Sequence, residues 1–261
     1  MNEYIIMNSL GSGADGKVNL CMNANSGTLF AIKILDKDKL RKKRVCQQEK
    51  TALTDVMNGI EIMKTLNHEN IIRLHEVVDD ESCSLLFLII SLMEYGPIVD
   101  PKYYQKETGE WIEEETARKY FRDVVLGLKY LHNQRICHRD IKPANLLVDK
   151  HHVCHISDFG VAFQFEGDDD RLTSSAGTPS FLSPELCKSD GNPRGCPADI
   201  WALGVSLYYL IFAELPFRGN SLAELYDEIC QKEVEFPREI DPSLEDLFAK
   251  MLCKDQDQRI K

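Results

Sequence analysis

The stretch His138-Arg139-Asp140-Ile141-Lys142-Pro143-Ala144-Asn145, followed by Asp158-Phe159-Gly160, holds the most informative side chains of this sequence. Asp140 can accept a proton from a hydroxyl group, and Asn145 offers an amide oxygen that can hold a metal ion. Asp158 supplies a second hard oxygen ligand. A base and two metal ligands in this order are typical of phosphoryl transfer to a hydroxyl group.

A glycine-rich segment lies upstream, at Gly11-Ser12-Gly13-Ala14-Asp15-Gly16-Lys17-Val18. Glycines let backbone N–H groups approach phosphate oxygens because no Cβ stands in the way. The same G-x-G-x-x-G spacing occurs in dinucleotide-binding folds, where a helix follows it, but here the pattern predicts a strand. Lys33, in Phe30-Ala31-Ile32-Lys33, is then expected to reach the α- and β-phosphates of ATP.

Composition narrows the class of protein. The 261 residues carry a formal net charge of −11, which argues against a nucleic-acid-binding protein. Nine cysteines without a C-x-x-C pair indicate reduced thiols, and we expect a cytoplasmic protein, with a nuclear location as the alternative. The N-terminus has no secretory signal pattern. The apolar stretch from Ile200 to Ala213 is too short for a membrane span and predicts a buried helix.

Hydrophobic periodicity predicts two parts. Residues 4–34 alternate apolar segments with turn residues, which indicates three antiparallel strands. Gly96-Pro97 breaks the pattern and separates residues 1–93 from residues 94–261, with a hinge near 91–96. We further predict strands at Ile71–Val78 and Leu85–Met93, and helices at Thr54–Leu66, Glu113–His132, Asp199–Ala213, Ser221–Gln231 and around Leu244–Leu252.

With these motifs in order over nearly the whole chain, the sequence resembles the eukaryotic protein kinases. Lys142 follows Asp140 in Asp-Ile-Lys-Pro-Ala-Asn, which is typical of the serine/threonine branch. Residues 92–98, 120–132 and 177–185 are similar to the calcium/calmodulin-dependent protein kinase kinases. The resemblance implies an α+β fold with a small antiparallel β-rich N-lobe, which has one main helix, and a larger, mainly helical C-lobe. It also implies ATP and Mg²⁺ as cofactors and protein substrates, with other kinases among them.

The resemblance assigns roles to individual residues. Asp140 would be the base, Lys142 would lie beside the transferred phosphoryl group, and Asn145 and Asp158 would hold Mg²⁺. The phosphates and adenine would contact Leu10, Gly11, Gly13, Gly16, Val18, Ala31, Lys33, Leu147 and the backbone of Ser91 and Met93, behind Ile90. Further expectations are hydrogen bonds of Thr178 with Asp140 and Lys142, a buried Glu185–Arg259 pair, and phosphorylation at Thr173, Ser174 or Ser175 beside Arg139.

One position departs from the family pattern. Kinases pair the strand lysine with a glutamate on the following helix, and counting back from Asn67-His68-Glu69-Asn70 places Gly59 there. Asp55, one turn earlier, or Glu61, brought round by a local bulge, are the candidate substitutes. If neither serves, Gly59→Glu is expected to give Lys33 a partner and raise turnover. The alternative to an active kinase is therefore a nucleotide-binding, pseudokinase-like scaffold.

Two further features concern partners. A basic run, Lys37, Lys39, Arg41, Lys42, Lys43 and Arg44, is compatible with a solvated linker or with a docking surface for an acidic partner kinase. The similar kinase kinases carry a basic insert at this place. The chain ends at Arg259-Ile260-Lys261, which suggests a truncated C-lobe, and any contact with calmodulin would need segments outside this sequence.

Overall fold

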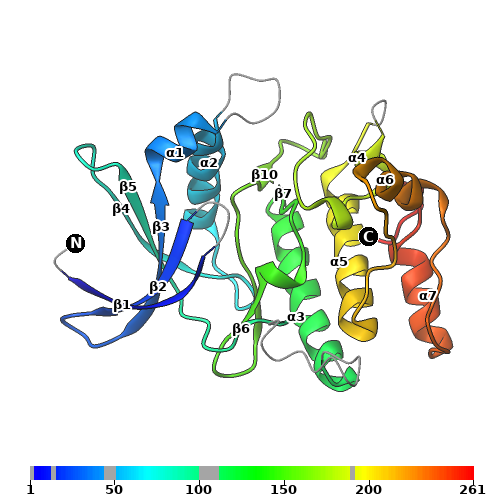
Figure 1. Ribbon diagram of the computed structural model, residues 1–261, viewed down its shortest axis with the longest axis horizontal. Helices are drawn as coiled ribbons and strands as arrows, with labels where there is room; N and C mark the ends of the chain where they lie inside the picture. Colours follow the sequence, from blue (N-terminus) through cyan, green and yellow to red (C-terminus); the bar gives the residue numbers. More distant parts are fainter. Residues whose placement is uncertain (1–2, 13–15, 44–50, 100–111, 189–191) are drawn as a thin grey trace.

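The computed structural model describes residues 3–12, 16–43, 51–99, 112–188 and 192–261. Figure 1 shows a sheet with two helices on one side of the molecule and a mainly helical part on the other. This arrangement is the α+β, two-part architecture predicted from the sequence. The segment between the two parts runs from Ile90, the end of the last strand of the sheet, to the two-residue strand β6 (Gly96–Pro97).

The N-terminal part is built on a five-stranded antiparallel sheet in the order β1-β2-β3-β5-β4. Its strands are β1 (Tyr4–Ser12), β2 (Gly16–Asn23), β3 (Leu29–Asp36), β4 (Leu74–Asp79) and β5 (Leu85–Ile90). Helix α2 (Ala52–Thr65) covers one face of this sheet, where Ile60 packs in a cluster with Leu35, Leu86 and Leu88. Lys33 lies on β3, which pairs with β2 on one side and with β5 on the other and is therefore the central strand of the sheet.

The C-terminal part is organised around α5 (Gly195–Phe212), which is apolar over most of its length. By length and composition α5 could cross a membrane, but 72% of it is buried inside the domain, as predicted for a core helix. Around it lie α3 (Glu114–Asn133), α4 (Pro184–Cys187), α6 (Leu222–Gln231) and α7 (Pro242–Met251). Short strands β7 (Ile136–Cys137), β8 (Leu146–Val148), β9 (Cys154–Ile156) and β10 (Phe163–Gln164) flank the catalytic segment.

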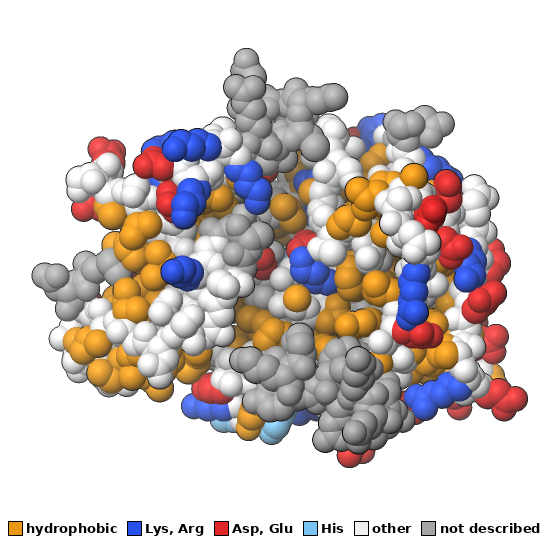
Figure 2. Space-filling view, viewed as in Figure 1, with side chains coloured by type: hydrophobic (Ala, Val, Ile, Leu, Met, Phe, Trp, Pro, Cys, Tyr) orange, Lys and Arg blue, Asp and Glu red, His pale blue; other side chains and the backbone are white. Residues whose placement is uncertain are grey.

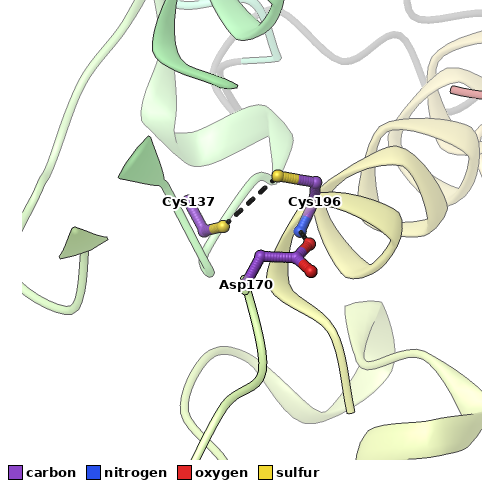
Figure 3. A group of neighbouring side chains, drawn as sticks. All are labelled: Cys137, Asp170 and Cys196. Carbon is purple, nitrogen blue, oxygen red and sulfur yellow. Dashed lines mark hydrogen bonds between the residues drawn. The ribbon is translucent and has the colours of Figure 1, made fainter. Parts of the chain in front are cut away.

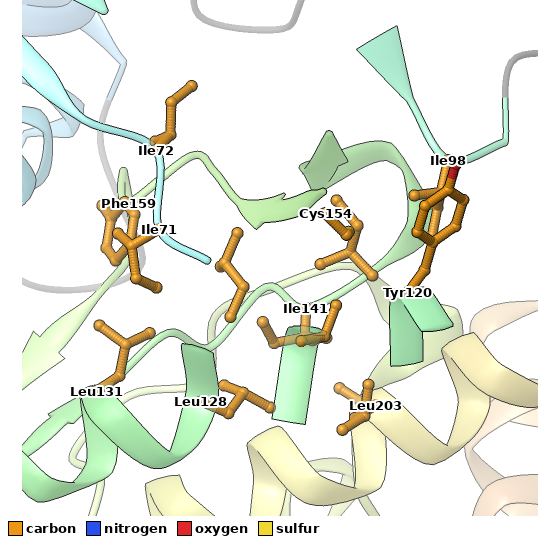
Figure 4. Close-up of a cluster of buried hydrophobic side chains, with 14 of the residues drawn as sticks. Ile71, Ile72, Ile98, Tyr120, Leu128, Leu131, Ile141, Cys154, Phe159 and Leu203 are labelled. Carbon is orange, nitrogen blue, oxygen red and sulfur yellow. The ribbon is translucent and has the colours of Figure 1, made fainter. Parts of the chain in front are cut away.

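One large apolar cluster supports the catalytic segment from below (Figure 4). Leu128 and Leu131 of α3, Ile141 and Phe159 belong to it, and each is at most 2% exposed. Ile141 lies between Asp140 and Lys142 in the sequence, and Phe159 follows Asp158. Burial of these two apolar side chains therefore fixes the backbone that carries the polar ones.

Most predicted elements appear, with boundaries that differ by a few residues. The strand predicted from Ile71 begins at Leu74, because Ile71 forms only an isolated bridge to Ile156. The strand predicted to reach Met93 ends at Ile90, and α5 begins at Gly195 instead of Asp199. A six-residue helix, α1 (Lys37–Lys42), was not predicted; Asp36 caps it by accepting hydrogen bonds from the backbone of Asp38 and Lys39.

Candidate active site

The catalytic loop follows β7 and is anchored by a buried carboxylate on α5. Asp199 accepts a hydrogen bond from the His138 backbone N–H at 2.9 Å and from the Arg139 N–H at 2.8 Å. Arg139 has a left-handed φ of 69°, an uncommon conformation for a residue with a side chain. Two hydrogen bonds to a carboxylate that is 0% exposed hold the loop in this turn. Sequence analysis missed this role, although an acid at the start of an apolar helix was a visible signal.

Asp140 lies at the centre of a compact polar network. Lys142 Nζ donates to Asp140 Oδ2 at 2.7 Å and to Thr178 Oγ1 at 2.6 Å. Thr178 in turn donates to Asp140 Oδ1 at 2.8 Å, so the predicted contacts of Thr178 are confirmed. Asn145 Nδ2 donates to the Asp140 carbonyl at 2.8 Å and to Oδ2 at 2.9 Å. The carboxylate of Asp140 is thereby held in one orientation, as a positioned base must be.

Asp158 lies two residues after the end of β9 and pairs with Lys33. Lys33 Nζ donates to Asp158 Oδ1 at 2.9 Å. Burial raises the pKa of Asp158, but the charge and hydrogen bond of Lys33 more than offset it, so that the pKa lies below its ordinary value. Asp158 also has a left-handed φ of 65°, which turns its carboxylate toward Lys33. The group is thus kept ionised, as a metal ligand requires.

The residues predicted to hold a divalent metal fit that task by their chemistry. Both amide hydrogens of Asn145 are used by Asp140, which leaves its amide oxygen as the atom that can face a cation. Asp158 adds an ionised carboxylate. Two hard oxygen donors of this type suit Mg²⁺ or a similar ion.

The carboxylates proposed as substitutes for the missing glutamate do not pair with Lys33. Helix α2 is regular from Ala52 to Thr65, without the predicted bulge, and Glu61 instead accepts a hydrogen bond from Lys64 at 2.7 Å. Among the described residues, Lys33 forms its ion pair with Asp158, and no hydrogen bond or ion pair joins it to Asp55. The expectation that Asp55 or Glu61 serves Lys33 is therefore wrong, because the partner comes from the Asp158-Phe159-Gly160 segment.

The predicted nucleotide residues lie around one end of the sheet. Gly11 and Val18 pair across β1 and β2, and Ala31 pairs with Ile90 across β3 and β5. Gly16, Leu10 and Leu147 are on β2, β1 and β8, and Gly13 lies outside the described residues. These placements bring the glycine-rich segment, Ala31 and Lys33 onto neighbouring strands.

The hinge backbone offers a donor and an acceptor. The Ser91 N–H donates to the Arg73 carbonyl at 3.0 Å, and the Met93 carbonyl accepts from the Gly96 N–H at 3.1 Å. Within the described part of the chain, these bonds leave the Ser91 carbonyl and the Met93 N–H for a ligand. An adenine edge presents one donor and one acceptor to such a pair.

A cavity of about 460 Å³ lies beside the hinge but away from the catalytic side chains. It shares Ser91 and Met93 with the predicted adenine site, and its other walls include Phe30, His75 and His155. It contains none of the apolar residues predicted to enclose the adenine ring. This cavity therefore differs from the predicted nucleotide site, which would include the Lys33–Asp158 pair.

The activation segment contacts the catalytic loop directly. Arg139 Nη2 donates to the Ser174 carbonyl at 2.7 Å and to its hydroxyl at 3.2 Å. Gly177 has a φ of 112°, and a Cβ there would lie 2.5 Å from the Arg139 carbonyl oxygen, so only glycine fits this approach. Of the three hydroxyls predicted to face Arg139, Ser174 is thus the one in hydrogen-bonding contact.

Two buried clusters tie the end of this segment to the C-terminal part. Arg259 forms the predicted two-pronged pair with Glu185, at 2.7 and 2.9 Å. In the second cluster, Cys137 Sγ and Cys196 Sγ are 3.6 Å apart, beside Asp170 (Figure 3). The carboxylate of Asp170 is already neutralised by Arg194 at 2.7 Å and accepts the Cys196 N–H at 3.0 Å. We interpret this group of side chains as a structural junction between the activation segment and α5.

Comparison with known proteins agrees with this geometry. Residues 4–261 match the protein kinase domain family. Over its whole length the chain is 44% identical to a probable serine/threonine-protein kinase of Dictyostelium discoideum, 37% of which it covers. It is 41% identical to serine/threonine-protein kinase GRIK2 of Arabidopsis thaliana, covering 63% of it. It is 36% identical to a calcium/calmodulin-dependent protein kinase kinase of Caenorhabditis elegans, covering 51%.

The chain thus spans between about a third and two thirds of the length of these relatives. Its match to the domain family, by contrast, is nearly complete and includes every motif of the site described above. The chain belongs to the protein kinase family and is a protein kinase domain of the serine/threonine type.

Proposed function

We propose that this domain is catalytically active and transfers the γ-phosphate of ATP, with Mg²⁺, to serine or threonine hydroxyls of other protein kinases. The observation that carries the catalytic part is the assembled network of Asp140, Lys142 and Thr178, with the Lys33–Asp158 pair beside it. These contacts hold the polar groups in one arrangement, so little reorganisation is required for reaction.

Each side chain has a task that follows from its contacts. Asp140 accepts the hydroxyl proton, and its orientation is fixed by Lys142 and Asn145. Lys142 carries a positive charge beside that base, where it offsets negative charge that develops on the transferred group. Asn145 and Asp158 hold the metal ion, which when bound neutralises phosphate charge.

The nucleotide is oriented at its two ends by different parts of the chain. Lys33, on β3, attracts phosphate oxygens as a compact cation. The Ser91 carbonyl and the Met93 N–H fix the adenine edge, and the apolar side chains of Ala31 and Leu147 enclose the ring. The Lys33 ammonium group has three N–H donors, so it can contact phosphate oxygens while one donor remains bonded to Asp158.

Two observations support kinases as the substrate class. The relative from Caenorhabditis elegans is named a kinase kinase, and the chain carries a basic run at α1 in an acidic domain. Figure 2 shows Lys and Arg side chains over this region.

The described residues of this basic run differ in burial and in their contacts. Lys37 is buried and donates to Asp79 at 2.6 Å, so its role is structural. Arg41 pairs with Asp38 on its own helix at 3.0 Å, and Lys42 is exposed. Arg44 lies outside the described residues. Lys39 Nζ lies 3.5 Å from Asp36 Oδ2, and its side chain is 85% exposed. A partner would therefore meet the exposed side chains of Lys39, Arg41 and Lys42.

The test compares a folded kinase substrate with a short peptide taken from its activation loop. Replacing Arg41, Lys42, Lys43 and Arg44 with Ala is expected to slow phosphorylation of the folded kinase, most strongly at low salt, and to leave the peptide rate nearly unchanged. A control that replaces Arg118, Lys119, Arg122 and Lys129 of α3 with Ala removes the same charge elsewhere.

Equal losses on both substrates would indicate general damage, and no loss on either would make the run a solvated linker. An equal effect of the α3 control on the folded kinase would show that total charge, and not this surface, determines the rate. Mass spectrometry of the product identifies the phosphorylated residue. Phosphate confined to tyrosine, or found outside the activation loop, would contradict the proposed substrate class.

A further inference from the structure

Gly59 lies where helix α2 meets the backbone of Phe159 and Gly160. A Cβ built at Gly59 would be 2.3 Å from the Phe159 carbonyl oxygen, 3.0 Å from its carbonyl carbon and 3.5 Å from Gly160 Cα. Real Cβ atoms essentially never approach another atom within 3.0 Å. The neighbouring atoms belong to the main chain, so they cannot move aside as a flexible side chain could. The helix reaches its observed position only because residue 59 has no side chain.

Kinases normally attach this helix by an ion pair between the strand lysine and a glutamate of the helix. Among the described residues of this protein, no residue of α2 pairs with Lys33. Lys33 is satisfied by Asp158 at 2.9 Å, and Glu61 faces solvent and pairs with Lys64 at 2.7 Å. The contact at Gly59 is one residue from Asp158 along the chain. A shift of the Phe159 backbone would therefore also move Asp158.

We propose that Gly59 is a positioning residue: α2 is coupled to the active site by backbone packing on Phe159 and Gly160, in place of an ion pair with Lys33. The proposal rests on the proposed kinase activity. The ring of Phe159 is fixed by His138, whose ring centroid is 5.1 Å away, and by the apolar cluster that contains Met63 of α2. Because the ring and the carbonyl group of Phe159 are both held, the preceding residue, Asp158, is held in one position.

This account reverses the expectation for Gly59→Glu. A glutamate there would not reach Lys33 from the observed helix position, because its Cβ already overlaps Phe159. Either α2 moves outward, which removes its packing on Phe159 and Gly160, or the Phe159–Gly160 backbone moves, which shifts the adjacent Asp158, a residue that would hold the metal. The glycine thus avoids a steric clash with the Phe159 backbone, in addition to removing an ion-pair partner of Lys33.

The direction in which Gly59→Ala changes the melting temperature distinguishes an effect of packing from an effect of helix propensity. At an ordinary helix position, Gly→Ala raises the melting temperature by about 2–4 °C, because glycine is a poor helix former. At Gly59 we expect Ala to lower it. Asn58→Ala, at the exposed neighbouring position, is the matched control and is expected to leave it unchanged or raise it.

Hydrogen exchange provides a readout that general destabilisation would not move selectively. The Phe159 carbonyl accepts a hydrogen bond from the Ala162 N–H at 3.1 Å. A methyl group at residue 59 pushes on this same carbonyl oxygen. We expect Gly59→Ala to speed exchange in a peptide spanning Phe159–Ala162 more than in α5, with no such change in Asn58→Ala.

The kinetic experiment compares wild type, Gly59→Ala, Gly59→Glu and Asn58→Ala. We expect Gly59→Ala to lower kcat on the order of 10- to 100-fold, as misplacement of a reacting group does, and to raise the Mg²⁺ concentration needed for half-maximal rate. Gly59→Glu is expected to be at least as impaired, and Asn58→Ala to resemble wild type. If Gly59→Glu is insoluble, Gly59→Ala decides.

Wild-type activity in Gly59→Glu, or a higher melting temperature with unchanged exchange in Gly59→Ala, would overturn the proposal. Exchange and melting do not require phosphotransfer. If the wild-type domain proves inactive, they still test the contact at Gly59, and so the failure of the kinase proposal is distinguishable from the failure of this one.

Discussion

Arg259 is the largest charged residue among the fully buried ones that the structure describes. It pairs with both carboxylate oxygens of Glu185 and donates to the carbonyls of Pro197 at 2.9 Å and Cys253 at 3.0 Å. The side chains of Arg259 and Glu185 are 0% and 7% exposed. The guanidinium carbon also lies 5.1 Å from the centre of the Trp201 ring. This pair fixes the end of the activation segment to the segment that follows α7.

Glu185→Ala removes the only charge that compensates the guanidinium among these contacts. Arginine does not lose its proton in proteins, so the variant must bury an unpaired cation or unfold locally. Breaking a buried pair in this way costs about 3–5 kcal/mol. At about 2–4 °C per kcal/mol, the melting temperature should fall by roughly 6–20 °C. Urea unfolding and thermal melting of the purified variants measure both quantities.

Two further variants make the test specific. Glu114→Ala breaks an exposed pair with Arg118, at 2.9 Å and with side chains 67% and 79% exposed, and should cost at most about 1 kcal/mol. The double variant Glu185→Ala with Arg259→Leu removes both buried charges, and should be more stable than Glu185→Ala alone. A loss below about 1 kcal/mol in Glu185→Ala, or no recovery in the double variant, would refute the argument that an unpaired buried charge dominates.

Three other outcomes follow from individual contacts. Burial lowers the pKa of His132, but its hydrogen bond to Asp199 at 2.9 Å more than offsets this and raises it. This stabilisation is full below about pH 6.5 and is lost as pH rises through the higher folded pKa, so His132→Gln should flatten the decline of melting temperature above pH 6.5. Thr178→Val should lower kcat by about 10- to 100-fold, because hydrogen bonds to charged groups contribute about 1.5–3 kcal/mol, while KM for ATP stays unchanged in steady-state assays. Phosphate on Ser174 would lie beside Arg139, so phosphatase treatment should slow the wild type and leave Ser174→Ala unaffected.

The sequence predicted those parts of the site that depend on spacing along the chain. Asp140, Lys142 and Asn145 lie within six residues of one another, and their contacts follow once the loop forms. The pair between Glu185 and Arg259 was predicted from the family resemblance and is confirmed. The two-part fold followed from strand patterns near the N-terminus and helical spacing beyond the hinge.

The sequence could not predict contacts that depend on how distant elements pack. Lys33 pairs with Asp158, 125 residues away, and no local pattern distinguishes that carboxylate from Asp55. The small distance between Gly59 and Phe159 is a property of helix placement, and a glycine in a sequence does not reveal what it approaches. Helix α1 was missed because five of its six residues are charged, and it forms when Asp36 caps it and Lys37 and Leu40 are buried.

The most direct test of the account is phosphotransfer from ATP to a generic serine/threonine protein substrate, with wild type and Asp140→Asn compared side by side. We predict metal-dependent incorporation by the wild type, and a loss of at least about 100-fold in Asp140→Asn with an unchanged melting temperature. Nucleotide binding by both proteins, with incorporation by the wild type no greater than by Asp140→Asn, would contradict the account and make the domain a nucleotide-binding scaffold.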